Sequence, residues 1–83
     1  FDLAFVAPDA VSAESLRKAL RTAAGALAED VTLFDVYRRE GERSLAFRIR
    51  LRGADHTLTD ADVAGVRTQC IAAATRLGVT LRG

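Results

Sequence analysis

Residues 34–52 read FDVYRREGERSLAFRIRLR, and this stretch decides the fold. Its second half alternates apolar and polar residues. The apolar set is Leu45, Phe47, Ile49 and Leu51, and the intervening set is Ser44, Ala46, Arg48, Arg50 and Arg52. A period of two predicts a β-strand with one buried face and one open face. The arginines of this strand are therefore expected to point away from the core together.

The partner strand is predicted over residues 31–37, which also follow a period of two. One side of this strand is expected to hold Phe34 and Val36, and the other side Leu33, Asp35 and Tyr37. A hairpin closed by the polar segment RREGER would place Tyr37 opposite Ser44. Asp35 would then lie opposite Ala46, on the same open face as the arginines.

The open face of this hairpin is a candidate surface for single-stranded RNA. A ring can stack on a base, a carboxylate and a hydroxyl can bond base edges, and guanidinium groups can meet phosphates. The residues expected to contact RNA are Asp35, Tyr37, Ser44, Ala46, Arg48 and Arg50. Between residues 38 and 52, six arginines stand against two glutamates, whereas the whole chain carries a net charge of only +1. This contrast predicts a local basic patch rather than a general attraction to polyanions.

The composition bounds the class of protein. Eighty-three residues make one domain with a modest core, so we expect a single domain over residues 1–83. One cysteine, Cys70, and one histidine leave no internal disulfide and no zinc cluster to build. The sequence holds no apolar run near the ~18 to 20 residues of a membrane span and no signal-peptide pattern. We expect a cytoplasmic protein, and the start at Phe1 indicates a fragment of a longer chain.

The segments before the hairpin supply a strand and a helix. Residues 2–7 predict a strand that is buried on both sides and hence central in the sheet. Ser12 is a suitable N-cap for the helix that follows, and Val11 can form a hydrophobic staple with Leu16. Gly25 is expected to end this helix.

The segment TLTDAD, residues 57–62, predicts the start of a second helix. Thr59 serves as its N-cap and Asp62 returns the hydrogen bond, which makes a capping box. The buried stripe of this helix is expected to hold Val63, Val66, Cys70, Ala73, Ala74 and Leu77. Gly78 ends the helix, and residues 79–82 predict a short last strand.

The order of these elements is β-α-β-β-α-β, which predicts two split βαβ units. The expected fold class is α+β, a ferredoxin-like sandwich with a four-stranded antiparallel sheet and two helices on one face. The other face of the sheet is left open, and it is the face on which the candidate RNA-binding residues are expected to lie.

Five short motifs follow one another along nearly the whole chain. They are DLAF at residues 2–5, FDVY at 34–37, SLAF at 44–47, TLTD at 57–60 and the dipeptide Leu81-Arg82. Each motif alone is weak, but FD-x-Y followed by SLA and TLTD is a specific combination. In this combination the chain resembles the ferredoxin-fold anticodon-binding domain of the bacterial phenylalanyl-tRNA synthetase β subunit.

The resemblance implies a role in protein biosynthesis. It implies binding of the anticodon stem-loop of tRNA(Phe), with Tyr37 stacked on an anticodon base and Asp35 accepting from a base edge. Ser44 and Ala46 would line the same site. The whole enzyme that the resemblance implies is phenylalanine–tRNA ligase, an α2β2 heterotetramer that uses ATP and Mg²⁺. Its chemistry is expected in the α subunit, so this domain is expected to be non-catalytic and to hold no cofactor.

The sequence departs from the family pattern at three places. The hairpin after FD-x-Y is shortened to residues 38–43. Phe1 stands before the first Asp of the opening strand and His56 stands before TLTD, two places where the family usually has arginine. A neutral or weakly cationic histidine would make a weaker phosphate contact.

Two other functions share this fold class. An acylphosphatase-like enzyme would need a glycine-bearing anion loop after the first strand, and residues 7–11 contain an aspartate and no glycine. A ferredoxin-like regulatory or dimerisation module would instead use the open face for a second copy of the chain. A row of arginines facing its own symmetry mate disfavours that arrangement.

Overall fold

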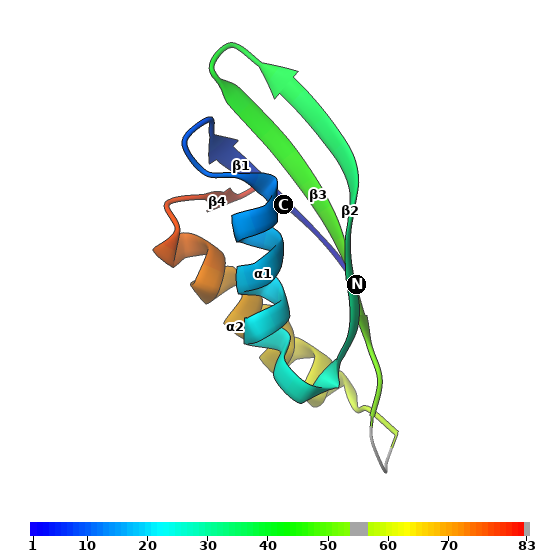
Figure 1. Ribbon diagram of the computed structural model, residues 1–83. Helices are drawn as coiled ribbons and strands as arrows, with labels where there is room; N and C mark the ends of the chain where they lie inside the picture. Colours follow the sequence, from blue (N-terminus) through cyan, green and yellow to red (C-terminus); the bar gives the residue numbers. More distant parts are fainter. Residues whose placement is uncertain (54–56, 83) are drawn as a thin grey trace.

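The computed structural model describes residues 1–53 and 57–82, apart from the side chain of Arg39. The elements follow the predicted order (Figure 1). They are β1 (Asp2–Pro8), α1 (Ala13–Ala24), a short 3-10 helix η1 (Gly25–Leu27), β2 (Ala28–Arg39), β3 (Glu42–Leu51), α2 (Asp60–Arg76) and β4 (Thr80–Leu81). No helix among the described residues has the length and apolar character that crossing a bilayer requires.

The four strands of the described chain form one antiparallel sheet in the order β2-β3-β1-β4. Both α-helices cover the same face of this sheet, and the opposite face is open (Figure 1). The prediction of a ferredoxin-like α+β fold is therefore confirmed. β1 lies between β3 and β4, so its predicted central place in the sheet is confirmed. Its expected burial on both sides is only partly met, because Ala4 and Val6 on the open face are half-buried.

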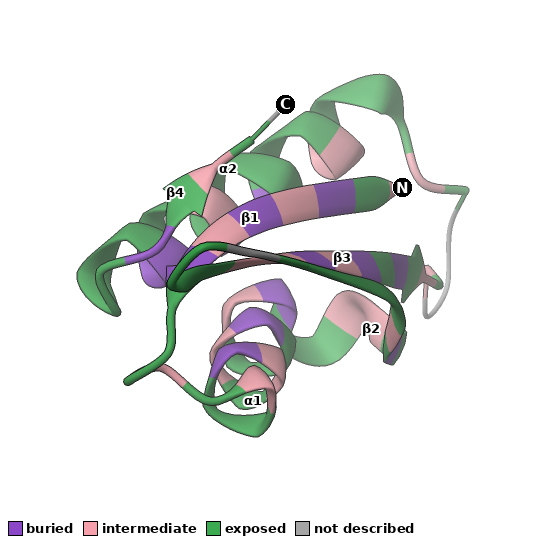
Figure 2. Cartoon of the chain, turned by 90° about the horizontal axis from the view of Figure 1, so that it is seen from above, coloured by how far each residue is buried: buried purple, intermediate pink, exposed green. Residues whose placement is uncertain are grey.

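The core lies between the helices and one face of the two central strands. Alternate residues of β1 and β3 are buried along this face, as the banding of both strands in Figure 2 shows. The largest fully buried side chains are Phe5, Phe47, Leu3, Leu16, Leu20, Leu45, Ile49 and Cys70. Burial of each large apolar side chain stabilises the fold by roughly 1.5 to 3 kcal/mol before entropy costs are set against it.

α1 begins and ends as its sequence predicts. The Oγ of Ser12 accepts a hydrogen bond of 3.0 Å from the backbone N–H of Ser15, which satisfies one of the unpaired donors of the first turn. Val11 packs against the core, in keeping with a staple to Leu16. Gly25 ends the helix at φ +64°, a conformation that favours glycine.

α2 opens on the predicted capping box. The hydroxyl of Thr59 accepts a bond of 3.1 Å from the N–H of Asp62, whose carboxylate accepts one of 3.0 Å from the N–H of Thr59. Leu77 was expected in the buried stripe, but this expectation is wrong because Leu77 is 36% exposed. Leu77 is the C-cap residue of α2, where the chain leaves the helix and turns at Gly78.

The β2–β3 hairpin is tighter than the six-residue connection that its polar composition indicated. β2 runs to Arg39 and β3 starts at Glu42, so only Glu40 and Gly41 form the turn. Gly41 has φ +76°, which a side chain would oppose. The polar residues on either side of the turn therefore belong to the strands and extend the sheet.

A β-bulge in β2 changes which residues face the core. Leu33 pairs with Phe47 and the next pair is Asp35 with Ala46, so Phe34 is an extra residue without a partner. Leu33 thereby takes the helix side of the sheet, opposite buried Phe47, and its predicted place on the open face is wrong. Phe34 was expected on the face opposite to that of Asp35, away from the open side. Its ring instead lies beside Arg48 on the open face.

Beyond the bulge the predicted alternation holds. Val36 pairs with Leu45 on the helix side, while Asp35 and Tyr37 face the open side. Val36 is nevertheless 48% exposed. β2 is an edge strand, so Val36 is less covered than its partner Leu45 on the central strand β3, which is fully buried. The hairpin end also extends past the two helices (Figure 1).

Candidate nucleic-acid interface

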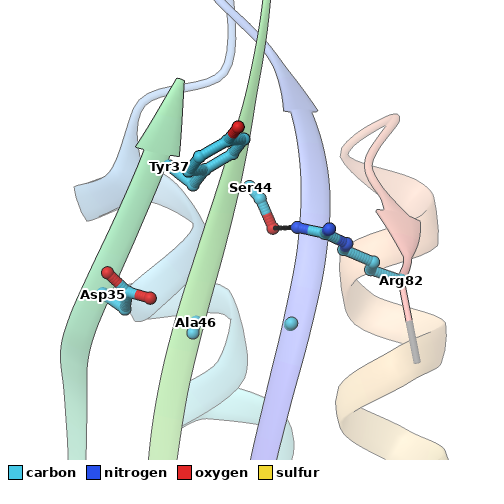
Figure 3. Close-up of a pocket in the computed structure, with 6 residues that line it drawn as sticks. Asp35, Tyr37, Ser44, Ala46 and Arg82 are labelled. Carbon is cyan, nitrogen blue, oxygen red and sulfur yellow. Dashed lines mark hydrogen bonds between the residues drawn. The ribbon is translucent and has the colours of Figure 1, made fainter. Parts of the chain in front are cut away.

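A pocket of about 370 Å³ lies on the open face of the sheet (Figure 3). It is lined by Ala4, Asp35, Tyr37, Ser44, Ala46 and Arg82. The register predicted for the hairpin is confirmed, because Tyr37 pairs with Ser44 and Asp35 pairs with Ala46. Four of the six residues singled out in the sequence therefore meet at one place, although their role in RNA binding stays a prediction.

The depth of this pocket comes from small side chains on the central strands. Ala4 of β1 pairs with Ala46 of β3, and two methyl groups make a low floor. Tyr37 and Asp35 rise from β2 on one side of this floor, and Arg82 rises beyond β1 on the other (Figure 3). The floor is thus flat and apolar, while its two rims carry opposite charges.

Tyr37 offers a free aromatic surface at this pocket. Its side chain is 57% exposed, although a tyrosine ring gains most stability from burial. In Figure 3 the ring stands above β3 beside Ser44, and its plane is not covered by any other residue drawn there. An exposed ring at the rim of a pocket is suited to stack on a planar ligand.

Arg82 is a residue of the pocket that the site prediction missed. Its Nη1 donates a hydrogen bond of 2.9 Å to the Oγ of Ser44 (Figure 3). The backbone N–H of Arg82 also donates to the carbonyl of Ala4 at 2.7 Å, which fixes the end of β4 against β1. The only signal in the sequence was the dipeptide Leu81-Arg82, which contributed to the family resemblance without indicating a contact.

Arg48 lies on the same open face but outside the pocket. Its guanidinium binds both oxygens of Asp2, with Nε–Oδ1 and Nη2–Oδ2 distances of 3.0 and 3.3 Å. This hydrogen bonding holds the pKa of Asp2 below its ordinary value and raises that of Arg48. Arg48 is therefore an oriented ion-pair partner rather than a free cation.

Arg50 lies further along β3, also outside the pocket. It pairs in register with Asp30, whose carboxylate accepts a bond of 2.6 Å from the hydroxyl of Thr32. Within the described residues, the Arg50 guanidinium takes part in no ion pair. It is thus the candidate phosphate contact at the end of the sheet away from the hairpin turn.

The basic patch is smaller than the sequence indicated. Arg38 and Arg43 both turn to the helix side and approach the carboxylate of Asp9, at 3.2 and 3.6 Å. Arg43 also donates to the backbone carbonyls of Pro8 and Val11, so it fastens the connection between β1 and α1. The side chain of Arg39 and all of His56 lie outside the described residues.

The buried thiol of Cys70 is the core residue that its position in the helical stripe predicted. It is fully buried, it lies 3.7 Å from the carbonyl oxygen of Leu20, and burial raises its pKa. Among residues 1–53 and 57–82, no three His, Cys, Asp or Glu side chains gather as a metal site. The chemistry that the open-face pocket offers is stacking, hydrogen bonding and charge complementarity.

These features define a class: a ferredoxin-like α+β module with a pocket on an open sheet face. The sequence model of the ferredoxin-fold anticodon binding domain matches residues 1–82. The chain belongs to this family.

The chain is similar to curated proteins named phenylalanine–tRNA ligase β subunit. The protein from Cutibacterium acnes is 47% identical over 88% of this chain. Those from Synechococcus and Corynebacterium diphtheriae are each 45% identical over 98% of it. The chain spans about a tenth of the length of these relatives, from 9% to 10%.

Proposed function

We propose that this chain is the tRNA anticodon-binding module of a phenylalanine–tRNA ligase β subunit, and that its open sheet face recognises the anticodon of tRNA(Phe). Membership of the anticodon-binding family and the names of the relatives support this role. The observation that carries the assignment to the open face is the pocket between Tyr37, Asp35 and Arg82, above an alanine floor.

Tyr37 is the proposed stacking platform for one anticodon base. Base–aromatic stacking contributes roughly 1 to 3 kcal/mol per base. The floor formed by Ala4 and Ala46 leaves room for the edge of the base to reach the rims of the pocket. A larger side chain at either alanine would fill this space.

The opposed charges of the rims favour guanine. The Watson–Crick edge of guanine presents N–H donors, which the carboxylate of Asp35 can accept. Its O6 and N7 atoms are acceptors, and arginine is the side chain that most often bonds this pair. Arg82 stands on the other side of the pocket with its orientation set by Ser44. Adenine would direct its N1 acceptor at a carboxylate and leave both groups unsatisfied, which is costly in a partly desolvated site.

The phosphates of the loop are proposed to contact Arg50 and other exposed cations at a modest total strength. For single-stranded nucleic acid, each phosphate contact changes the slope of log K against log salt by about −0.7. Because Arg38, Arg43 and Arg48 are engaged by aspartates, we expect a total slope of only about −1 to −2. Most affinity for tRNA would then come from the rest of the enzyme.

The aminoacylation reaction is proposed to lie outside this chain. In the whole enzyme, which we propose to be a cytoplasmic α2β2 heterotetramer, the α subunit carries that chemistry and ATP and Mg²⁺ serve it. The contribution of the module is to select and hold the tRNA.

Binding of an anticodon stem-loop of tRNA(Phe) to the 83-residue chain tests the proposal. Fluorescence anisotropy at two salt concentrations would compare the wild type with Tyr37→Ala, Tyr37→Phe and Asp35→Asn. We expect Tyr37→Ala to weaken binding about 5- to 100-fold at both salts. Tyr37→Phe should retain most of the affinity, and Asp35→Asn should lower the preference for guanine over adenine at the first anticodon position.

The opposite outcome is equally clear. If the chain binds loops with guanine or adenine at that position equally well, and only Arg50→Gln changes the affinity, the surface is merely electrostatic. The pocket would then have no role in recognition. Sedimentation of the free chain at the same concentrations checks that self-association through the open face does not account for the result.

A further inference from the structure

We propose that Phe34 and Arg48 form a second base-stacking position on the open face, beside the Tyr37 pocket. This inference rests on the proposed function, since it assigns a neighbouring base of the same bound RNA to this position. The occupant is a nucleobase that follows or precedes the base held by Tyr37 in a single strand.

The bulge in β2 creates the position. As the unpaired residue between Leu33 and Asp35, Phe34 leaves the regular alternation, and its ring lies against the guanidinium of Arg48. The distance from the Arg48 Cζ atom to the ring centroid is 4.8 Å, within the range of a cation–π contact. The ring remains 48% exposed, so the contact does not bury it.

Asp2 holds the Arg48 plane in place. Its two carboxylate oxygens bind the Nε and Nη2 edge of the guanidinium, while 56% of the Arg48 side chain stays exposed. A planar guanidinium stacks on bases much as an aromatic ring does. Because Asp2 already neutralises its charge, we expect Arg48 to contribute stacking area rather than attraction to phosphate.

The two stacking positions lie two steps apart along β3, because Tyr37 pairs with Ser44 and the second position holds Arg48. Ser44, Ala46 and Arg48 occupy successive places on the same face, and two residues of a strand span about 7 Å, so the two positions are about 14 Å apart. A strand of RNA that runs along β3 from the pocket therefore meets Phe34 and Arg48 next. The sheet would bind two bases, one on Tyr37 and the other on the Phe34–Arg48 pair.

Protein–RNA double-mutant cycles test this assignment. The probe is an anticodon stem-loop of tRNA(Phe) in which each loop nucleotide in turn is made abasic. We expect Phe34→Ala to weaken binding of the intact loop about 5- to 30-fold, equally at low and high salt. In one abasic loop only, Phe34→Ala should no longer weaken binding, because the base that stacks on Phe34 is already missing. The abasic position that cancels the effect of Tyr37→Ala should be a different one.

Matched variants separate stacking from folding. Phe34→Trp keeps a ring and should restore the affinity. Val36 has the same exposed fraction as Phe34, 48%, but faces the helix side, so Val36→Ala should leave binding unchanged. Thermal unfolding followed by circular dichroism shows whether each variant keeps the fold.

The possible failures are distinct. If Tyr37→Ala weakens binding but Phe34→Ala does not, the second position is refuted while the proposed function stands. The second position is also refuted if one abasic nucleotide cancels the effects of both Tyr37→Ala and Phe34→Ala, because a single base would then account for both losses. If neither variant changes the affinity, the proposed function itself fails.

Discussion

Arg82 and Ser44, which are 38 residues apart in the sequence, are joined by a hydrogen bond of 2.9 Å that crosses β1. The bond links the end of the edge strand β4 to the central strand β3. This bond holds the guanidinium of Arg82 at the pocket and leaves its remaining N–H groups for a ligand. A short last strand thereby supplies one rim of the candidate site.

Removal of this guanidinium should weaken RNA binding without unfolding the domain. A hydrogen bond to a charged group contributes about 1.5 to 3 kcal/mol, so Arg82→Ala should lower the affinity for a guanine-bearing loop at least tenfold. Ser44→Ala should have a smaller effect in the same direction, since it only frees the side chain. Anisotropy titrations measure both. Arg76→Ala, at an exposed arginine of α2, is the control, and a loss of equal size there would contradict a specific role for Arg82.

The pKa of Asp2 provides a direct test of its pairing with Arg48. In the folded chain this pKa lies below its ordinary value of 3.8, chiefly because Arg48 donates hydrogen bonds to the carboxylate. The stabilising contribution is therefore complete above 3.8 and is lost as the pH falls through the depressed value. Arg48→Gln should raise the Asp2 pKa towards 3.8 in a carboxyl NMR titration.

The titration of Glu14 is an internal control for this experiment. Its pKa is lowered by a different partner, Arg17, which donates to both of its carboxylate oxygens. The pKa of Glu14 should be the same in the Arg48→Gln variant as in the wild type. An unchanged Asp2 midpoint in that variant would show that the pair does not form in solution.

Two phenylalanines in adjacent strands should differ in their effect on stability. Phe47 is fully buried, whereas Phe34 is 48% exposed. Phe47→Ala should therefore lower the free energy of unfolding by about 3 to 5 kcal/mol, and Phe34→Ala by roughly 1 kcal/mol or less. Urea denaturation of the two variants measures this difference. Similar losses would mean that Phe34 packs into the core, and that its ring is not available on the open face.

The N-cap of α2 should be sensitive to substitution although it is exposed. Thr59→Ala removes the hydroxyl that accepts from the N–H of Asp62, and we expect a loss of about 0.5 to 2 kcal/mol in the free energy of unfolding. Thr59→Ser keeps the acceptor and should restore most of the stability. Thr68→Ala, in the exposed interior of the same helix, should not destabilise the fold, because alanine has the higher helix propensity. A cap variant as stable as the wild type would contradict the capping box.

Much of the fold could be read from local patterns. The alternation in β3 is sustained over residues of sharply different polarity, so its two faces were unambiguous. The helix caps at Ser12 and Thr59 rest on contacts within three residues, which the sequence specifies directly. The register between Tyr37 and Ser44 followed from centring the hairpin on the polar segment RREGER, and the shorter turn at Glu40 and Gly41 keeps the same centre.

The bulge could not be read because apolar residues stand at both parities around it, Val31 and Leu33 at odd positions and Phe34 and Val36 at even ones. Only the pairing of Leu33 with Phe47 decides which of them face the core. The contacts of Arg48 and Arg82 are tertiary, since their partners come from β1 and β3. Counting charges along the chain likewise overestimated the basic patch, because the aspartates that engage three of its arginines lie in or just after β1.

Because Phe34 has no partner in the β2–β3 ladder, the chain could lose this residue and keep the pairing of the two strands. Its neighbours Leu33 and Asp35 already pair with consecutive residues of β3, so deletion of Phe34 would close the ladder without shifting any other pair. Asp35 and Tyr37 would keep their facing, and the pocket would remain. A single inserted or deleted codon could therefore add or remove the second stacking position during evolution, while the first position and the fold stayed intact.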